Sequence, residues 1–442
     1  MMHIAIACSS LCSSMGGSER AATNLANEMA ARGHAVTLLS LTHNNRKTNP
    51  LYALREGVTH IAWENQGKHA EIRALRNTLQ TRSIDVFLSM QSGSDHLFWA
   101  MACMGSGIPF ICSERCDPIR YTEQRVWNRS GRLAVLSGAD VIHELLPAYV
   151  ESVPEFCRSR VRVIPNAAPS SSSAARAKGE TGQRKALLYL ARFDKQKRPL
   201  LLLEAFRQLS GEYPDWDLIL WGHGPQEPFL RRQIKAWNLQ KKIHMPGICR
   251  DAQAAYAKAQ IYCIPSSYEG FPNTVLEAMC AGLPVVGFAE CAGVRDVIEH
   301  GKTGVVVPES TPEALAAALR ALMASGELRE ALGNAAQKAA AETYAPKKIY
   351  GQWERLFAEL ATIKGNTVMD TFAEEPFASQ ARLSAVARRE WLSRDFGMPM
   401  PYTATWFAQR GTRLCRNLGV LALSGLKDWG KRLLVGKGQK AN

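Results

Sequence analysis

The sequence predicts an α/β protein with two successive domains, each built on a parallel sheet with helices on its faces. Along residues 3–345, short apolar runs alternate with stretches whose apolar residues follow the helical period. The alternation stops once, at residues 169–185, where Ser, Ala, Gly and charged residues show no apolar periodicity. The chain's 442 residues also exceed the size at which a single hydrophobic core stops growing.

The first domain is predicted to span residues 1–168. Residues 3–8 are its first expected strand, and a loop follows over residues 9–17. Apolar residues then recur at i, i+3, i+4 and i+7 as Ala22, Leu25, Ala26 and Met29. Gly33 follows at the expected helix stop, and a strand at residues 35–39 completes a βαβ unit with parallel strands. The remaining expected strands are residues 85–89, 109–113 and 161–164.

The second domain is predicted to span residues 186–345, after the linker of residues 169–185. Apolar runs and helical periods alternate again in this part of the chain. The expected strands are residues 186–190, 216–221, 261–265 and 284–288, and the expected helices are residues 199–209, 229–237 and 274–281. Residues 346–363 then carry helical periodicity, and we expect this helix to return to the first domain.

The final residues, 364–442, differ in composition from the two domains. Residues 381–442 carry 12 Lys/Arg against 3 Asp/Glu, and they supply most of the net charge of +14. Three tryptophans accompany these cations: Trp391, Trp406 and Trp429. Such a tail is expected to associate with an anionic membrane surface, at about 1 kcal/mol per cation. The alternatives are a solvated extension and a helical pair packed on the body. No nucleic-acid recognition motif accompanies the charge, so no nucleic-acid partner is expected.

Composition excludes several other classes of protein. The eleven cysteines have no repeating frame, which favours reduced thiols, and no two pairs have the spacing of zinc ligands. Asp215 and Asp217 lie at the amino end of a predicted strand, away from the expected site, and are not expected to bind a metal. No apolar run approaches the ~18 residues of a membrane span. The first residues lack the features of a signal peptide, so a cytoplasmic location is expected.

Two predicted helix starts lie where ligands bind in such folds, at the carboxyl ends of parallel strands. Gly16 and Gly17 immediately precede the first helix, and a helix N-terminus with a glycine backbone favours phosphate. Asn273, as the expected N-cap of the helix at 274–281, makes a second candidate anion site. The alternative in each case is an ordinary turn before a helix.

Charged residues after the second-domain strands are the candidate reactive groups. Glu269 follows the strand at 261–265, and Glu277 lies about one turn into the next helix. Carboxylates in such positions accept hydrogen bonds from sugar hydroxyls. Arg192 and Lys197 follow the first strand of the domain and are placed to neutralise a departing diphosphate. Taken singly, a helix-dipole contact, a solvated carboxylate or a basic loop explains these residues equally well.

Together these segments resemble glycosyltransferase family 4, the retaining enzymes whose two Rossmann-like domains form the GT-B fold. The resemblance spans about residues 3–362. Its most specific stretch is residues 267–284, where Glu269 and Glu277 are separated by seven residues and a small-Gly-x-Pro turn follows. Other landmarks in the family's order are Gly16-Gly17-Ser18-Glu19-Arg20, Pro165-Asn166, Arg192 with Lys197, and Gly222-x-Gly224-Pro225.

The resemblance implies a nucleotide diphosphate-sugar donor, expected to be a UDP-sugar. In the family, residues matching Arg192 and Lys197 hold the leaving diphosphate, Glu277 binds the ribose, and Glu269 holds hydroxyls of the transferred sugar. No metal and no other cofactor is implied, because cations and helix ends stabilise the charge. The residues implied to bind the donor are Gly16, Gly17, Gly222, Gly224, Gly270, Phe271, Pro272, Asn273, Thr274 and Glu277.

One departure from the family concerns the first domain. Many members carry a histidine after the strand that matches residues 109–113, but this chain has Ser113-Glu114-Arg115. That form resembles a subgroup in which several members build bacterial surface glycans with N-acetylated hexosamines, and it makes Glu114 and Arg115 candidate catalytic residues. The implied reaction is retaining transfer of a hexose or N-acetylhexosamine to a lipid-linked glycan at the inner face of the cytoplasmic membrane, in polysaccharide or lipopolysaccharide biosynthesis.

Two other functions stay open at this point. A sugar-nucleotide epimerase or hydrolase could use the same architecture, and a non-catalytic membrane partner could keep the fold without the activity. The glutamate pair disfavours the first, and the intact Arg192, Lys197, Glu269 and Glu277 disfavour the second. The sequence leaves the sugar, the linkage, the acceptor and the oligomeric state undetermined.

Overall fold

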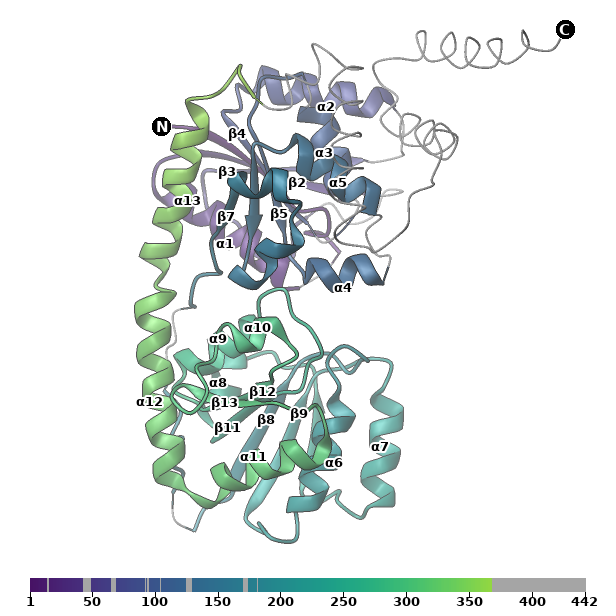
Figure 1. Ribbon diagram of the computed structural model, residues 1–442, viewed down its shortest axis with the longest axis vertical. Helices are drawn as coiled ribbons and strands as arrows, with labels where there is room; N and C mark the ends of the chain where they lie inside the picture. Colours follow the sequence, from purple (N-terminus) through teal and green to yellow (C-terminus); the bar gives the residue numbers. More distant parts are fainter. Residues whose placement is uncertain are drawn as a thin grey trace, which may run out of the picture.

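Two parallel β-sheets, one in each half of the chain, organise the protein (Figure 1). The computed structural model describes residues 1–13, 16–42, 49–64, 69–91, 93, 95–103, 105–124, 129–169, 174–180 and 182–367. The predicted α/β class, with two Rossmann-like domains facing each other, is confirmed. The tail predicted at residues 364–442 lies outside the described residues from residue 368 onward.

The first sheet has seven strands in the order β3-β2-β1-β4-β5-β6-β7, and all neighbouring strands are parallel. Its strands are β1 (His3–Ala7), β2 (Ala35–Thr42), β3 (Val58–Glu64), β4 (Val86–Gln91), β5 (Phe110–Glu114), β6 (Val141–Glu144) and β7 (Val161–Val163). Ile4 and Ile6 of the central strand β1 pack into the core on one face, whereas Ala5 and Ala7 pack on the other. The sheet is therefore buried on both faces, as parallel sheets are.

The second sheet has six strands in the order β10-β9-β8-β11-β12-β13, again all parallel. Its strands are β8 (Lys185–Leu190), β9 (Trp216–Trp221), β10 (Ile243–Gly247), β11 (Ile261–Ile264), β12 (Val285–Phe288) and β13 (Gly304–Val307). In both sheets the strand order reverses beside the first strand of the domain, β1 or β8. Ligands bind at such switch points, outside the carboxyl ends of the strands.

Helices cover both faces of each sheet (Figure 1). In the first half they are α1 (Gly17–Ala31), α2 (His69–Thr81), α3 (Asp95–Cys103), α4 (Pro118–Glu123) and α5 (Arg129–Gly138), with 3-10 turns η1 (Pro147–Ser152) and η2 (Glu155–Arg160). In the second half they are α6 (Pro199–Leu209), α7 (Glu227–Ala236), α8 (Ala252–Ala257), α9 (Asn273–Cys280), α10 (Ala292–Arg295), α11 (Pro312–Ala324), α12 (Gly326–Thr343) and α13 (Pro346–Ala361). Within the described residues, no helix combines the length and apolarity needed to cross a bilayer.

The last helix, α13, belongs to the core of the first sheet although it follows the second domain in the sequence. Its apolar face packs with β1 and α1 through Ile349, Trp353, Leu356, Phe357 and Leu360. Arg32, just after α1, donates from Nη1 to Glu354 at 2.7 Å. α12 and α13 run one after the other along one side of both halves (Figure 1). They therefore tie the two domains together beside the linker, where Ala168 donates to the Tyr344 carbonyl and Lys178 pairs with Glu327.

The sequence patterns missed four strands, β3, β6, β10 and β13. β6 is short and ends in His143 and Glu144, so it lacks an uninterrupted apolar run. β10 contains Pro246, which is tolerated because β10 is an edge strand. The predicted N-cap of α9 was also wrong, since Pro272 occupies that position and Asn273 is the first helical residue. The side-chain amide of Asn273 can therefore form a hydrogen bond outside the helix.

Two buried histidines anchor the first domain. His143 lies between Ser113, whose Oγ is 2.8 Å from Nδ1, and the Ile164 carbonyl, 2.8 Å from Nε2. His96 Nδ1 lies 2.8 Å from the Ser89 hydroxyl. Burial lowers the pKa of His96 to about 4 and that of His143 to about 3. Both imidazoles are therefore neutral in the folded protein at neutral pH.

This neutrality predicts a loss of stability on mild acidification. Below the unfolded pKa of ~6.5 the unfolded chain binds protons that the folded chain excludes, so stability falls as the pH drops. The two histidines together should lower the free energy of unfolding by about 3 kcal/mol between pH 7.5 and 5.5. His143→Gln is expected to show about half of that decline, measured as the urea midpoint of tryptophan fluorescence at both pH values. An identical decline in both proteins would contradict the assignment.

Candidate functional site

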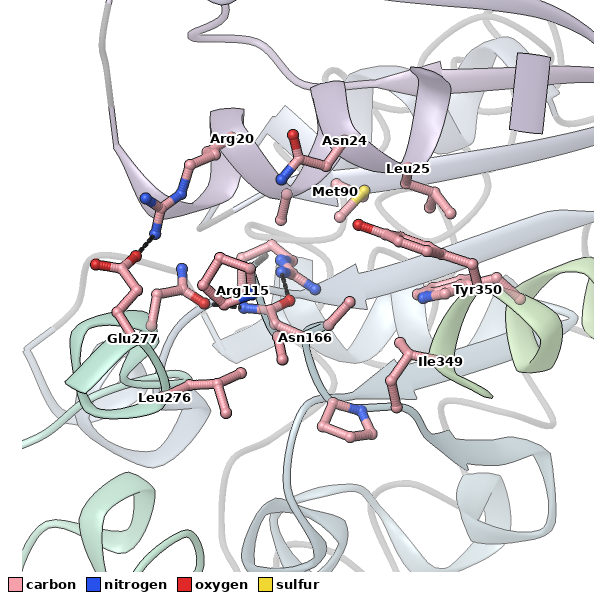
Figure 2. Close-up of a pocket in the computed structure, with 17 residues that line it drawn as sticks. Arg20, Asn24, Leu25, Met90, Arg115, Asn166, Leu276, Glu277, Ile349 and Tyr350 are labelled. Atoms are coloured by element: carbon pink, nitrogen blue, oxygen red, sulfur yellow. Dashed lines mark hydrogen bonds and ion pairs between the residues drawn. The ribbon is translucent and has the colours of Figure 1, made fainter. Parts of the chain in front are cut away.

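The two sheets face each other across a cleft, and the floor of this cleft contains a cavity of about 90 Å³ (Figure 2). The cavity is lined by side chains from α1, from the loop after β5, from the segment at residues 165–169, and from α9 and α13. Its charged lining residues are Arg20, Arg115 and Glu277. Groups predicted from distant parts of the sequence thus meet at one place.

Glycine allows the two halves to approach at the start of α1. Gly16 is extended, with φ −87° and ψ −178°, and Gly17 is the first helical residue. A Cβ atom on Gly17 would lie 2.7 Å from Nδ2 of Asn273 at the start of α9. The N-termini of α1 and α9 therefore meet across the cleft. The orphan N–H groups and positive dipole ends of both helices favour an anion there.

A relay of side-chain amides crosses the cleft beside these helix ends. Arg115 donates from Nη2 to Oδ1 of Asn166 at 2.5 Å, and Asn166 donates from Nδ2 to Oδ1 of Asn273 at 2.7 Å (Figure 2). Asn166 had been singled out only as part of a sequence landmark. Its position between the domains shows that it connects the loop after β5 to the start of α9.

Glu277 is 3% exposed and lies one turn into α9. Its carboxylate accepts from Tyr256 Oη at 2.9 Å and from Arg20 Nη2, which reaches across from α1 (Figure 2). Sequence reasoning gave Arg20 no role, although it belongs to the stretch Gly16-Gly17-Ser18-Glu19-Arg20. The carboxylate predicted to bind a ribose is thus paired with a cation of the opposite domain.

Glu269 and Lys197 form the second charged pair of the cleft. Lys197 Nζ lies 2.5 Å from Oε1 of Glu269, and both side chains are largely buried. The Lys197 backbone N–H donates to Asp194 at 2.9 Å, which fixes the turn after β8. Tyr149 of η1 donates its hydroxyl to the backbone carbonyl of Glu269. The pair is therefore held from both domains.

Arg192 lies apart from that pair. Its side chain is 66% exposed, and its Nη2 forms an ion pair with Oδ2 of Asp194 at 3.2 Å. Gly222 and Gly224 pack against its loop: a Cβ on either would lie within 2.5 Å of a backbone carbonyl, of Ala191 or Phe193. Both glycines have φ in the region that favours glycine, +146° and +155°. They shape the loop that carries Arg192.

Residues 270–274 form the turn from the loop after β11 into α9. A Cβ on Gly270 would lie 2.5 Å from the Arg115 carbonyl oxygen, so this glycine touches the first domain's backbone. Phe271 is buried in the second core, where its ring lies 5.8 Å from that of Tyr344. Pro272 caps α9, and the Thr274 carbonyl accepts from Tyr256 Oη at 3.3 Å. This turn therefore offers a ligand its backbone, since Phe271 faces inward.

Glu114, a predicted catalytic candidate, is committed to a buried ion pair. Arg132 Nε and Nη2 donate to its two oxygens at 2.8 and 2.6 Å. Burial opposes ionisation of Glu114, but the Arg132 guanidinium outweighs it and lowers the pKa of this carboxyl. Burial and the neighbouring Glu114 raise the pKa of Glu144 well above its usual range. These groups lie under the cleft floor, and of the two candidates only Arg115 lines the cavity.

Asp215 and Asp217 lie at the amino end of β9, where they pair with Lys185 and Arg184. Within the described ranges, no group of three or more His, Cys, Asp and Glu side chains is arranged to hold a metal ion. That the reaction needs no metal stays a prediction, which depends on Arg192, Lys197 and the helix ends stabilising the charge of the diphosphate.

Two family models match consecutive parts of the chain. Residues 15–172 match Glycosyltransferase Family 4, and residues 171–339 match Glycosyl transferases group 1. An uncharacterized glycosyltransferase of Haemophilus influenzae is 26% identical over 350 residues, which cover 77% of this chain and 96% of the relative.

A second relative, from Campylobacter jejuni, is named GalNAc-alpha-(1->4)-GalNAc-alpha-(1->3)-diNAcBac-PP-undecaprenol alpha-1,4-N-acetyl-D-galactosaminyltransferase. It is 24% identical over 362 residues, covering 78% of this chain and 96% of its own length. Among solved structures, Anabaena HepE in complex with UDP and glucose has a TM-score of 0.65 at 15% identity, covering 81% of this chain and 100% of that one. The structural likeness shows a shared GT-B fold.

The contact at Gly270 generates a prediction about packing between the domains. Gly270→Ala should force the backbone of Arg115 and Cys116 away, at a cost of about 1–3 kcal/mol for overpacking. Gly211→Ala is the matched control, since nothing lies within 4 Å of a Cβ there. Urea midpoints and the radius of gyration from X-ray scattering should show a less stable, more open protein for Gly270→Ala alone. Equal behaviour of the two variants would disprove the close approach.

Proposed function

Since the chain is a glycosyltransferase of the family 4 type with the GT-B fold, we propose that it transfers a hexose or N-acetylhexosamine from a UDP-sugar to a lipid-linked glycan, with retention of anomeric configuration. One observation carries the proposal: the N-termini of α1 and α9 meet beside Glu277 at a cavity between the domains, and the Lys197–Glu269 pair lies at the adjoining interdomain contact. A nucleotide diphosphate-sugar has phosphates that suit the two helix N-termini, and hydroxyls that can donate hydrogen bonds to the two carboxylates.

The nucleotide half of the donor is assigned to the second domain. Glu277 accepts hydrogen bonds from the ribose hydroxyls, taking them in place of the Arg20 guanidinium that it now holds. Lys197 and the exposed Arg192 pair with the diphosphate as it leaves, and the N–H groups at the starts of α1 and α9 add to this charge stabilisation. No metal is required in this scheme.

The sugar half is assigned to Glu269 and the turn at residues 270–274. The Glu269 carboxylate keeps Lys197 in place and has a second oxygen for a sugar hydroxyl. Because the leaving phosphate becomes more basic as the glycosidic bond breaks, it takes the proton of the acceptor hydroxyl on the same face of the sugar. This route needs no covalent nucleophile and gives retention.

The relatives support the proposed acceptor and setting. The Campylobacter jejuni relative is named for an undecaprenyl diphosphate-linked glycan, and HepE was solved with UDP. By analogy, this chain builds a bacterial cell-surface polysaccharide or lipopolysaccharide at the inner face of the cytoplasmic membrane. The basic residues 381–442 are proposed to hold it to anionic lipid there.

The role of Lys197 predicts a severe loss of turnover in Lys197→Ala. Removing one preorganised charge from the departing diphosphate should lower kcat about 100-fold or more. Lys195→Ala is the control, because Lys195 lies two residues away and is exposed. The assay is UDP release from UDP-N-acetylhexosamines and UDP-hexoses with a polyprenyl diphosphate-linked glycan. Similar turnover in both variants would rule out this role for Lys197.

The donor assignment predicts which nucleotides stabilise the protein. A thermal-shift panel of UDP, GDP, ADP and TDP, with and without EDTA, should show stabilisation by UDP that EDTA does not change. Glu277→Gln should weaken UDP about tenfold or more, because a hydrogen bond to a charged group is lost. Glu342→Gln, at an exposed site on α12, should bind as the wild type does. If no nucleotide stabilises the wild-type protein, the non-catalytic alternative is favoured instead.

A further inference from the structure

The guanidinium of Arg115 lies in the cleft cavity without an anionic partner. Its side chain is 8% exposed, and its Nη2 donates to the neutral amide of Asn166 at 2.5 Å. Its Nε is buried without a hydrogen-bond partner, and no ion pair of Arg115 is found in the part of the chain that the structure describes. A buried cation that lacks a counter-ion is costly. The site is therefore built for an anion that the protein itself does not supply.

Neighbouring carboxylates are committed elsewhere. Glu19, whose charge acts on Arg115 from α1, accepts a hydrogen bond from Ser10 and forms no hydrogen bond to the guanidinium. Glu114, the preceding residue, is neutralised by Arg132 through two hydrogen bonds. Asp117 uses its side chain to cap α4, accepting from the backbone N–H groups of Ile119 and Arg120. Glu277 lines the same cavity but is held by Arg20. The positive charge of Arg115 is thus left for a ligand.

The surroundings of Arg115 add to its preference for an anion. Asn166 links the guanidinium to Asn273 at the start of α9, through its 2.7 Å hydrogen bond. Gly17, at the start of α1, touches the same Asn273 amide. Figure 2 shows the Arg115 guanidinium between these two helices, within the cavity that Arg20 and Glu277 also line. Two helix N-termini and one guanidinium therefore surround a single place.

We propose that Arg115 is a further donor-binding residue, which pairs with the diphosphate of the nucleotide-sugar from the domain opposite to Lys197, and that Asn166 is the positioning residue that presents it. The inference rests on the proposed function. A guanidinium matches phosphate oxygens with two parallel N–H donors. The donor is favoured over the acceptor as the source of the phosphate, because Glu277 and Asn273, assigned to the donor, line the same cavity.

The assignment gives Asn166 a specific geometry. Its Oδ1 accepts from Arg115 while its Nδ2 donates to Asn273, so a single amide orients the guanidinium and joins it to α9. Asn166→Asp would place a carboxylate against the guanidinium and supply internally the anion that the ligand should supply. This variant should therefore weaken diphosphate binding although it keeps the acceptor for Arg115.

Calorimetric titration of UDP and uridine into Arg115→Gln tests the inference. The UDP dissociation constant should rise about tenfold or more, whereas uridine should bind as it does to the wild type. The nucleotide-free melting temperature should stay equal or rise, because a buried unpaired cation has been removed. Arg82→Gln, an exposed site before β4 at the amino edge of the sheet, is the matched control and should change neither affinity. Asn166→Asp should lose UDP affinity selectively as well.

Three results would overturn the inference. Unchanged UDP affinity in Arg115→Gln would show that the guanidinium does not bind the diphosphate. An equal loss of affinity for UDP and uridine, together with a lower melting temperature, would show that Arg115 only stabilises the structure. A wild-type protein that binds no UDP would remove the proposed function as well, whereas wild-type binding of UDP that Arg115→Gln retains would remove this inference alone.

Discussion

The backbone contact between the two domains is the constraint on which the cleft depends. α1 and α9 begin within reach of each other because Gly17 has no side chain to strike Asn273, and the turn before α9 touches the loop after β5 because Gly270 has none to strike Arg115. Two helix ends thereby converge, and their dipoles add to a positive region between them. Arg20, Arg115 and Glu277 line the cavity beside this region.

Two pairs of opposite charges in the cleft satisfy each other, whereas Arg115 has no ion-pair partner among the described residues. Lys197 holds Glu269, and Arg20 holds Glu277, each across a short distance in a poorly solvated place. Breaking either pair alone would leave a buried charge without a partner, which is costly. The proposed nucleotide diphosphate-sugar would replace both halves of such pairs at once, since its phosphates would accept hydrogen bonds from the cations and its hydroxyls would donate to the carboxylates. The same pairs therefore hold the side chains of the cleft in place, and their charges match those of the proposed donor.

The sequence predicted the fold class and the carboxylates because these depend on local patterns. Apolar periodicity predicted α1, α6 and α9. The spacing of Glu269 and Glu277 predicted two carboxylates in one cleft, and both are buried there. Pairings between domains could not be predicted, because they depend on how two cores are oriented. Glu114 and Arg115 are adjacent in sequence, yet Arg132 of α5 neutralises Glu114, whereas Arg115 forms no ion pair with any residue that the structure describes. Asn273 was also expected to cap α9, but its side chain instead accepts a hydrogen bond from Asn166.

The contacts between the domains are of two kinds, and the difference bears on how a ligand enters. Leu145, Leu146 and Tyr149 of the first half pack in the apolar core of the second, and α13 returns to the core of the first. Separating these surfaces exposes apolar area that no ligand covers. By contrast, the Arg20–Glu277 pair exchanges one polar partner for another when a nucleotide or water arrives. Opening of the cleft should therefore begin at the polar contacts, while the apolar contacts keep the two domains in their relative orientation.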